Sequence, residues 1–333
     1  MGKHITRRRF LKASAVTLGA AAVSDISALS SVFAEQANTS QVFFTGNITT
    51  KGLLDIYTRL SQERKLSGKV AVKLHSGEPG GHNFPAPTII KDLVQALKGT
   101  IVECNTAYPG NRFKTEMHKQ VLKDHGFAAI APVDVMDEEG SIILPFPDGK
   151  NITEDFVGSH FANYDSFMIL SHFKGHAMGG FGGALKNMSI GIASAEGKMW
   201  IHTAGTTRKL DDFSVCFQTD HNRFLESMAE AAGAVMNKLD DNLLYINLMN
   251  HLSVDCDCNG NPAPPELEDI GILASLDPVA LDRACVDLVY AADEKKSAAL
   301  RERIESRNGT HTLNHAEKLG LGSQKYEMVH IDG

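Results

Sequence analysis

The chain has 333 residues, 43% of them hydrophobic, and its formal net charge is −7. This length is sufficient for a large buried core in one large domain or two ordinary ones. An acidic protein gains no electrostatic attraction to nucleic acid or to an anionic membrane surface. We therefore expect neither of them as a partner.

The first 34 residues have the pattern of an export signal: a basic start, a short apolar run and small residues at the end. Arg7 and Arg8 stand shortly before Phe10 and Leu11, which resembles the signals of the twin-arginine translocase. We expect a signal peptide over residues 1–34, with that translocase as a partner. The protein would be exported in folded form to the periplasm or another extracytoplasmic space. No later segment approaches 18 apolar residues, so we expect no stable membrane span in the mature form.

Residues 35–67 are expected to be a polar linker and N-terminal segment, followed by an α/β domain over residues 68–332. The first half of that domain alternates between strand and helix patterns. The predicted elements are strands over 69–74, 100–102 and 128–131, helices over 87–97 and 113–127, a hairpin over 138–150 and a buried strand over 166–170. This alternation indicates an open α/β sheet.

The second half begins with a Gly-rich stretch over residues 175–191. Periodicity then predicts a helix over 222–239, strands over 243–249, 270–274 and 326–331, and helices over 298–306 and 312–318. Asp277 and Pro278 start a further helix, as N-cap and first residue, and Asp282 and Asp287 are assigned to its solvated face. We expect two lobes of open, mostly parallel sheets with helices on both faces and a ligand cleft between the lobes.

The densest group of polar residues directly follows the buried strand at 166–170. It contains His172, Lys174 and His176, whose side chains suit proton transfer. Open α/β sheets bind ligands at the carboxyl ends of their strands. These three residues are therefore the candidate catalytic residues.

Glycines at 180, 182 and 183 come next, and Lys186 follows them. Clustered glycines let the backbone approach a ligand closely. A helix that began near Gly183 would offer free N–H groups to a phosphate or carboxylate, with Lys186 in its first turn. Gly180, Gly182, Gly183 and Lys186 are therefore candidate cofactor-binding residues, and the alternative is a tight turn without a ligand.

Five cysteines are an odd number, which does not form a closed disulfide framework. Cys256 and Cys258 are too close in sequence for an easy mutual disulfide and suit metal or cluster ligation better, with Cys216 as a third candidate ligand. A reduced, partly structural pair is the simpler alternative, so an iron–sulfur cluster is the less favoured cofactor. Cys104 and Cys285 lie in apolar patterns and are expected in the core.

Several blocks of the sequence resemble an uncharacterised bacterial and archaeal family, a domain of unknown function that is often fused to ferredoxin-like iron–sulfur modules. The resemblance spans about residues 68–332. It is carried by residues 171–176, 180–187, 255–258, 269–275 and 277–282. The resemblance implies a family but no reaction, and the cysteine run of the ferredoxin module has no counterpart in this sequence.

A more remote resemblance is to the nickel-pincer lactate racemases. It rests on His176, residues 180–183, Lys186, residues 191–194 and His202, which occur in the same order and at matching intervals. The resemblance implies that Lys186 attaches a nickel-pincer nucleotide, that His202 ligates the metal and that His176 transfers a proton.

The racemases also carry a catalytic histidine in an early turn, and residues 105–112 have none, so the resemblance does not extend to lactate racemisation itself. The sequence favours an enzyme that performs proton or hydride chemistry on a small hydroxy- or oxo-acid, with a nickel-pincer nucleotide or another metal cofactor. The first alternative is an iron–sulfur or metal-binding electron-transfer protein that uses Cys256 and Cys258. The second is a non-catalytic periplasmic module that binds a small-molecule ligand.

Overall fold

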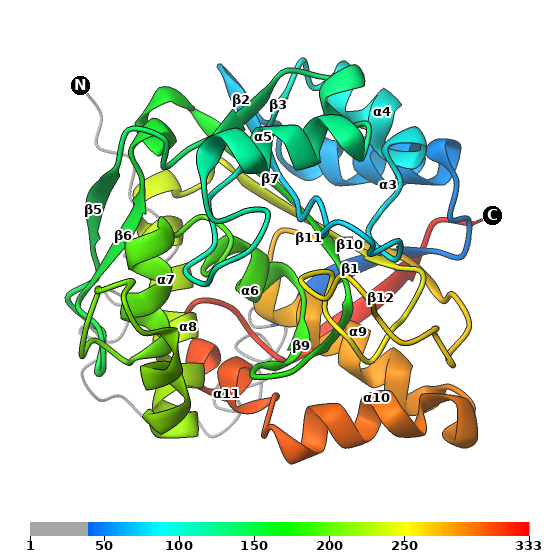
Figure 1. The fold of residues 1–333 in the computed structure, drawn as a ribbon. Coiled ribbons are helices and arrows are strands. Elements are labelled where there is room, and N and C mark those ends of the chain that lie inside the picture. Colours follow the sequence, from blue (N-terminus) through cyan, green and yellow to red (C-terminus); the bar gives the residue numbers. More distant parts are fainter. Residues whose placement is uncertain (1–38, 333) are drawn as a thin grey trace, which may run out of the picture. The chain divides into compact units, whose positions relative to one another are not determined.

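Eight strands form one mixed sheet in the computed structural model, which describes residues 39–332 (Figure 1). In order across the sheet they are β12 (Tyr326–His330), β1 (Ser40–Thr45), β11 (Gly271–Ser275), β10 (Leu243–Met249), β7 (Ser166–His172), β2 (Val70–Lys73), β3 (Thr100–Glu103) and β4 (Val133–Val135). From β10 to β4 every neighbouring pair is parallel, while β11 is antiparallel to both β10 and β1. The sheet is therefore mostly parallel, as predicted.

Helices cover both faces of this sheet because alternate strand side chains point to opposite faces. One face packs against α3 (Thr50–Glu63), α4 (Pro87–Ala96) and α5 (Thr115–Asp124). The hydrophobic core on the other face includes residues of α6 (Ala184–Met188), α8 (His221–Leu239), α9 (Pro278–Ala291), α10 (Glu294–Ser306) and α11 (His311–Lys318). In β7, Met168 and Leu170 belong to the hydrophobic core that contains α3, α4 and α5. Phe167 and Ile169 belong to the core on the opposite face. The predicted α/β class is confirmed.

The remaining elements are short and lie around the sheet. They are the hairpins β5 (Ser141–Pro145) with β6 (Glu154–Gly158) and β8 (Lys174–His176) with β9 (Gly180–Gly182), the helix α7 (Ala195–His202), and the 3₁₀ turns η1 (Phe127–Ala129), η2 (Ser159–Asn163) and η3 (Phe213–Gln218). The Gly-rich stretch packs through α6 onto a face of the large sheet, against β7 and β10. The described residues from Ser40 onward thus form one compact unit around a single large sheet, where the sequence predicted two lobes.

Three local predictions need correction. The strand expected over 128–131 is the 3₁₀ turn η1, and the strand comes later, as β4; a short apolar run does not distinguish the two. The hairpin expected over 138–150 places its turn correctly, but the strand that pairs with β5 is β6. Within 35–67, the expected linker instead contains β1 and α3, because β1 owes its place to long-range pairing with β11 and β12.

The predicted signal peptide lies outside the described residues. Of the helices in residues 39–332, none combines the length and apolar character needed to cross a membrane.

Candidate functional site

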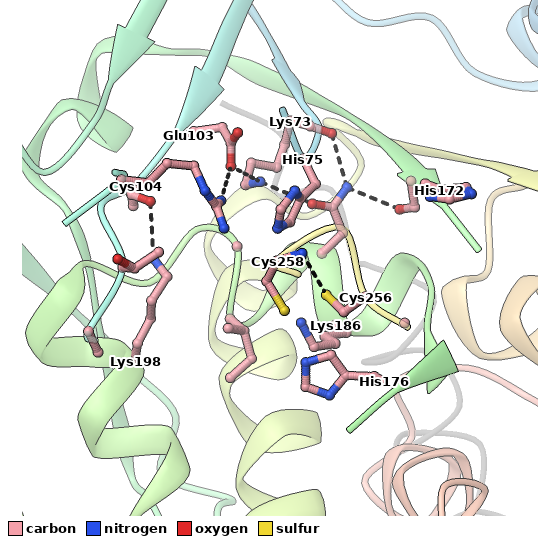
Figure 2. A pocket seen from close by; sticks show the side chains of 18 of the residues that line it. Lys73, His75, Glu103, Cys104, His172, His176, Lys186, Lys198, Cys256 and Cys258 are labelled. Atoms are coloured by element: carbon pink, nitrogen blue, oxygen red, sulfur yellow. Dashed lines mark hydrogen bonds and ion pairs between the residues drawn. The ribbon is translucent and has the colours of Figure 1, made fainter. Parts of the chain in front are cut away.

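A cavity lies at the carboxyl ends of three adjacent parallel strands, β7, β2 and β3 (Figure 2). Lys73, Glu103 and His172 are the last residues of these strands, and all three line the cavity. Its free space is about 780 Å³, with the open mouth included. Because open α/β sheets bind ligands at this edge, the cavity is the candidate functional site.

The Gly-rich stretch borders the cavity as the β8–β9 hairpin followed by α6. Gly175 in β8 lies so close to Val254 that an added Cβ would be 2.1 Å from the carbonyl oxygen of Val254. Only glycine permits such an approach, and it places the hairpin beside the loop that carries Cys256 and Cys258. Two segments that are distant in sequence thereby meet at one wall.

Most of the site residues predicted from the sequence line this one cavity. They are His172, Lys174, His176, Gly182, Gly183, Lys186, His202, Cys256 and Cys258. Gly180 is not in the cavity wall: its φ is 78°, and an added Cβ would lie 2.8 Å from the Cα of Gly309. In the structure Gly180 therefore permits a backbone contact with the segment before α11.

The start of α6 does not offer free N–H groups to a ligand, as the sequence had suggested. Asp282 of α9 accepts the amides of Ala184 and Leu185 at 2.7 and 3.0 Å. Its carboxylate fills the space beside Gly183, where an added Cβ would meet it at 2.3 Å. Asp282 is fully buried and not on a solvated face, and burial raises its pKa to about 6. An internal carboxylate thus caps the helix that carries Lys186.

His176 is held with one ring nitrogen already in use. Its Nδ1 accepts the amides of Gly179 at 2.8 Å and Met178 at 3.2 Å. Burial, and after it the nearby Lys186, lowers the pKa of His176 to about 4, so the ring is neutral at pH 7. A neutral ring that accepts at Nδ1 carries its proton on Nε2. In Figure 2 the ring is directed toward Lys186 and Cys256.

His202, at the end of α7, has the opposite arrangement. Its Nδ1–H donates to the carbonyl oxygen of Lys198 at 2.6 Å, and burial lowers the pKa of the ring to about 3. The lone pair of the neutral ring is therefore on Nε2. The ring stacks on Phe224, with centroids 4.9 Å apart, which keeps it in one orientation at the cavity wall.

Lys186 projects from α6 into the cavity, and its Nζ has no hydrogen-bond partner within residues 39–332. Burial lowers its pKa, although Cys256 and Cys258 oppose the shift. A lowered pKa increases the fraction of neutral, nucleophilic amine. Lys186 is thus an amine available for attachment or ligation.

Cys256 and Cys258 meet His176 at the same wall. One ligand atom from each of the three residues lies within 4.8 Å of the others, the single such group that could hold a metal in the described part of the chain. The pKa of Cys256 is well below its usual value because the Cys258 thiol donates to it and because His176 and Lys186 are close. Cys216, the third cysteine considered, is buried against Met199 instead, with the sulfurs 3.8 Å apart.

His172 and Lys174 are both bound to Asp257, in the same loop as the cysteines. His172 Nδ1 lies 3.0 Å from both carboxylate oxygens and its Nε2 lies 2.6 Å from the carbonyl oxygen of Asn250. Lys174 Nζ lies 2.9 Å from Asp257 and donates to the carbonyl oxygen of His172 at 3.1 Å. Although burial opposes it, the neighbouring His172 and Lys174 hold the pKa of Asp257 well below its usual range. The three residues join β7 and β8 to the cysteine loop.

The cavity wall also contains basic and acidic residues that were not predicted from the sequence, which are Lys73, His75, Glu103, Arg112 and Lys198. Two of them could have been predicted from the sequence. Lys73 and Glu103 are charged residues at the ends of predicted strands, where open α/β sheets bind their ligands. Arg112 follows a strand by a loop whose path no local pattern predicts. Lys198 lies within α7, and only tertiary packing turns it inward, where its Nζ donates to the carbonyl oxygen of Ala193 at 2.6 Å.

Among solved structures, the chain has a distant likeness to the lactate racemase apoprotein from Thermoanaerobacterium thermosaccharolyticum. The two are 13% identical with a TM-score of 0.41, over 77% of this chain and 58% of the other. A protein of Thermotoga maritima is also 13% identical, with a TM-score of 0.40, over 80% of this chain and 60% of the other. The chain thus spans about three fifths of each neighbour, and likeness at this level assigns no activity.

No curated protein matches the chain. A model of the family described as "Domain of unknown function (DUF362)" matches residues 70–287, which is more than half of the chain. The matched residues begin in β2 and end in α9, and they include His176, Lys186, His202 and both cysteines of the cavity wall. The chain therefore belongs to this family of domains of unknown function.

Proposed function

We propose that the protein is an enzyme that transfers a proton or hydride on a small hydroxy- or oxo-acid with the help of a metal-containing cofactor in the cavity. One observation carries the proposal. His176 and His202 line the same cavity as Lys186, with opposite tautomers: His176 presents an N–H at Nε2, and His202 presents a lone pair. One ring is thus prepared to donate a hydrogen bond to a substrate, and the other to bind a metal.

The residues present fit a nickel-pincer nucleotide, the cofactor implied by the racemase resemblance. Metal-ligating histidines usually donate their other N–H to a carboxylate or backbone carbonyl, and His202 does so to Lys198. Imidazole suits nickel. Lys186 offers an amine with a lowered pKa and free donors for covalent attachment. When bound, such a cofactor supplies a hydride acceptor and a Lewis acid.

The protein's own residues can orient and polarise a substrate next to that group. The two backbone amides on Nδ1 hold the ring of His176 in place, so that its Nε2 is directed toward Cys256 in the cavity wall. The ring is neutral, so its Nε2–H can donate a hydrogen bond to a substrate oxygen and stabilise negative charge that develops there. The lysines and Arg112 in the wall favour an anionic substrate such as a carboxylic acid.

A second candidate is a metal-binding or electron-transfer protein, favoured by the group of His176, Cys256 and Cys258. Two thiolates and an imidazole suit zinc or another thiophilic metal, with one coordination position left open. To bind a metal through Nε2, His176 would have to lose its Nε2 proton while Nδ1 still accepts two backbone amides. That requirement places the second candidate behind the first.

The test uses mature protein purified from its native producer, with intact mass and metal content as readouts. We expect an added mass on Lys186 together with a stoichiometric metal. Lys186→Ala and His202→Ala should each lose both, because one removes the attachment and the other a ligand. His176→Ala should retain mass and metal but lose about 100-fold or more of the turnover. Lys238→Ala and His330→Ala, at exposed positions, are the matched controls.

Other results would contradict the first candidate. Metal without added mass, lost in Cys256→Ser but not in Cys216→Ser, would support the second candidate. Brown absorbance with iron and sulfide would assign a cluster to the two cysteines. Wild-type protein with neither metal nor added mass would support the remaining alternative, a non-catalytic module that binds a small-molecule ligand.

A further inference from the structure

Arg112 is a buried cation whose hydrogen bonds are incomplete. It is 3% exposed, and it lines the cavity. Its Nε donates to Glu78 at 2.7 Å and its Nη2 donates to the hydroxyl of Tyr108 at 3.3 Å. Its Nη1 is 3.9 Å from Glu103, too far for a hydrogen bond. Among the described residues, Nη1 therefore has no acceptor.

We propose that Arg112 binds the carboxylate of the substrate and so makes the cavity selective for small monocarboxylic acids. This inference rests on the proposed function and names the substrate-binding residue of the same site. The guanidinium is planar and presents two parallel donors that match a carboxylate. Its bonds to Glu78 and Tyr108 fix that plane in advance, which reduces the entropy cost of binding.

The other cations of the wall have fewer donors to offer. Lys174 is paired with Asp257, Lys198 donates to backbone carbonyl oxygens, and Lys73 donates to the carbonyl oxygen of Leu74 and to Asn187. Lys186 has no hydrogen-bond acceptor among residues 39–332, but it is assigned to the cofactor in the proposed function. Arg112 is thus the cation left for the substrate.

The surroundings of Arg112 favour a single negative charge. Glu78 and Glu103 lie beside the guanidinium at 2.7 and 3.9 Å and already balance much of its charge. Both carboxylates would repel a dianion such as hydrogen phosphate more strongly than a monocarboxylate, which brings one charge and a matching shape. Tyr108 and Phe213, with ring centroids 5.5 Å apart, add an aromatic wall for a small carbon chain.

The test is calorimetric titration of the mature protein, as purified, with L-lactate, D-lactate and pyruvate. Lactamide serves as the neutral analogue and inorganic phosphate as the dianion. We expect at least one acid to bind, lactamide to bind at least tenfold more weakly and phosphate to bind more weakly than the acid. Arg112→Gln should weaken binding of the acid by about 30-fold or more, and Arg112→Lys, which keeps the charge but not the fork, by less.

Arg112→Gln leaves Glu78 without its partner, so the pair Glu78→Gln with Arg112→Gln provides a variant that removes both charges. It should also fail to bind the acid while retaining the wild-type circular dichroism spectrum. Arg59→Gln, which removes a half-buried arginine from α3, should bind like the wild type. Equal binding by Arg112→Gln, tighter binding of phosphate, or no binding of any acid to the wild type would overturn the inference. Arg112-dependent binding without turnover would uphold it while the proposed function fails.

Discussion

The roles proposed for the two central histidines depend on which ring nitrogen the backbone engages. Amides of the turn after β8 point at Nδ1 of His176, whereas a carbonyl of α7 points at Nδ1 of His202. The same side chain therefore offers a proton in one place and a lone pair in the other. Composition and spacing carry no trace of this difference, because it depends on local backbone direction.

Asp282 gives a prediction at the residue scale. It accepts two amides of α6 and the side-chain amide of Asn247, at 2.8 Å. In Asp282→Ala those buried donors lose their acceptor, so we expect a loss of about 2–4 kcal/mol in the free energy of unfolding. Urea unfolding followed by the fluorescence of Trp200, the single tryptophan, measures the change.

The matched control for this variant is Asp287→Ala in the same helix. Asp287 bonds Arg283 and Tyr326 but is more than a third exposed, so its removal should cost less than about 1 kcal/mol. An equal loss in the free energy of unfolding in both variants would show that any aspartate removed from α9 has this effect. The hydrogen bonds from Asp282 to α6 would then not be its cause. Asp282→Ala should also bind less cofactor, because α6 carries Lys186.

At the scale of elements, α6 is too short to be a stable helix by itself. Asp282 holds its start, and Asn187 holds its end to the sheet. The Asn187 side chain donates to the carbonyl oxygens of Lys73 and Leu170 at 3.1 and 3.2 Å, thereby tying α6 to β2 and β7. Lys186 is therefore positioned by the sheet.

Glu226 of α8 gives a prediction about how elements are joined. Its carboxylate binds Lys150 at 3.0 Å, Asn151 at 2.8 Å and His311 at 3.2 Å, which links the β5–β6 turn and α11 to α8. Although burial opposes the shift, these partners lower the pKa of Glu226 to about 2. The ionised form thus stabilises the fold above the unfolded-state pKa of about 4.5, and the stabilisation is lost as the pH falls toward about 2.

Glu226→Gln should therefore lower the free energy of unfolding by roughly 1–3 kcal/mol at neutral pH. The difference in the free energy of unfolding between this variant and the wild type should become smaller between about pH 5 and about pH 3, because the wild-type carboxylate becomes protonated. Urea midpoints across this range measure it. Glu302→Gln, at an exposed position on α10, is the control and should show no such narrowing. A difference independent of pH would rule out the ionised link.

At the scale of the whole molecule, we propose export in folded form on the basis of Arg7 and Arg8. Replacing both by Lys should leave the precursor in the cytoplasm, because the translocase recognises the arginine pair. Cell fractionation with an antibody to the protein is the measurement, and Arg9→Lys is the matched control. Export that persists in a strain without the translocase would disprove the route.

Much of the fold was predictable from local pattern. The strand expected over 243–249 is β10 with the same bounds, and Asp277 caps α9 as its sequence position suggested, accepting the amides of Val279 and Ala280. The sequence pattern of such a strand or helix cap involves only residues that are a few positions apart. β1 was not predictable, since its place between β11 and β12 depends on partners more than 200 residues away.

The sequence by itself determined most of the alternation of strands and helices, the family, and a group of candidate residues of which His176, Lys186 and His202 line the cavity. Periodicity, caps and motifs involve residues that are close together in sequence, so they can be recognised without the structure. Only the tertiary structure decided that Asp282 caps α6, that Cys256 and Cys258 meet His176, and that Arg112 faces the cavity with free donors. These contacts join residues that are far apart in sequence, and the packing of the helices and loops on the common sheet brings them together.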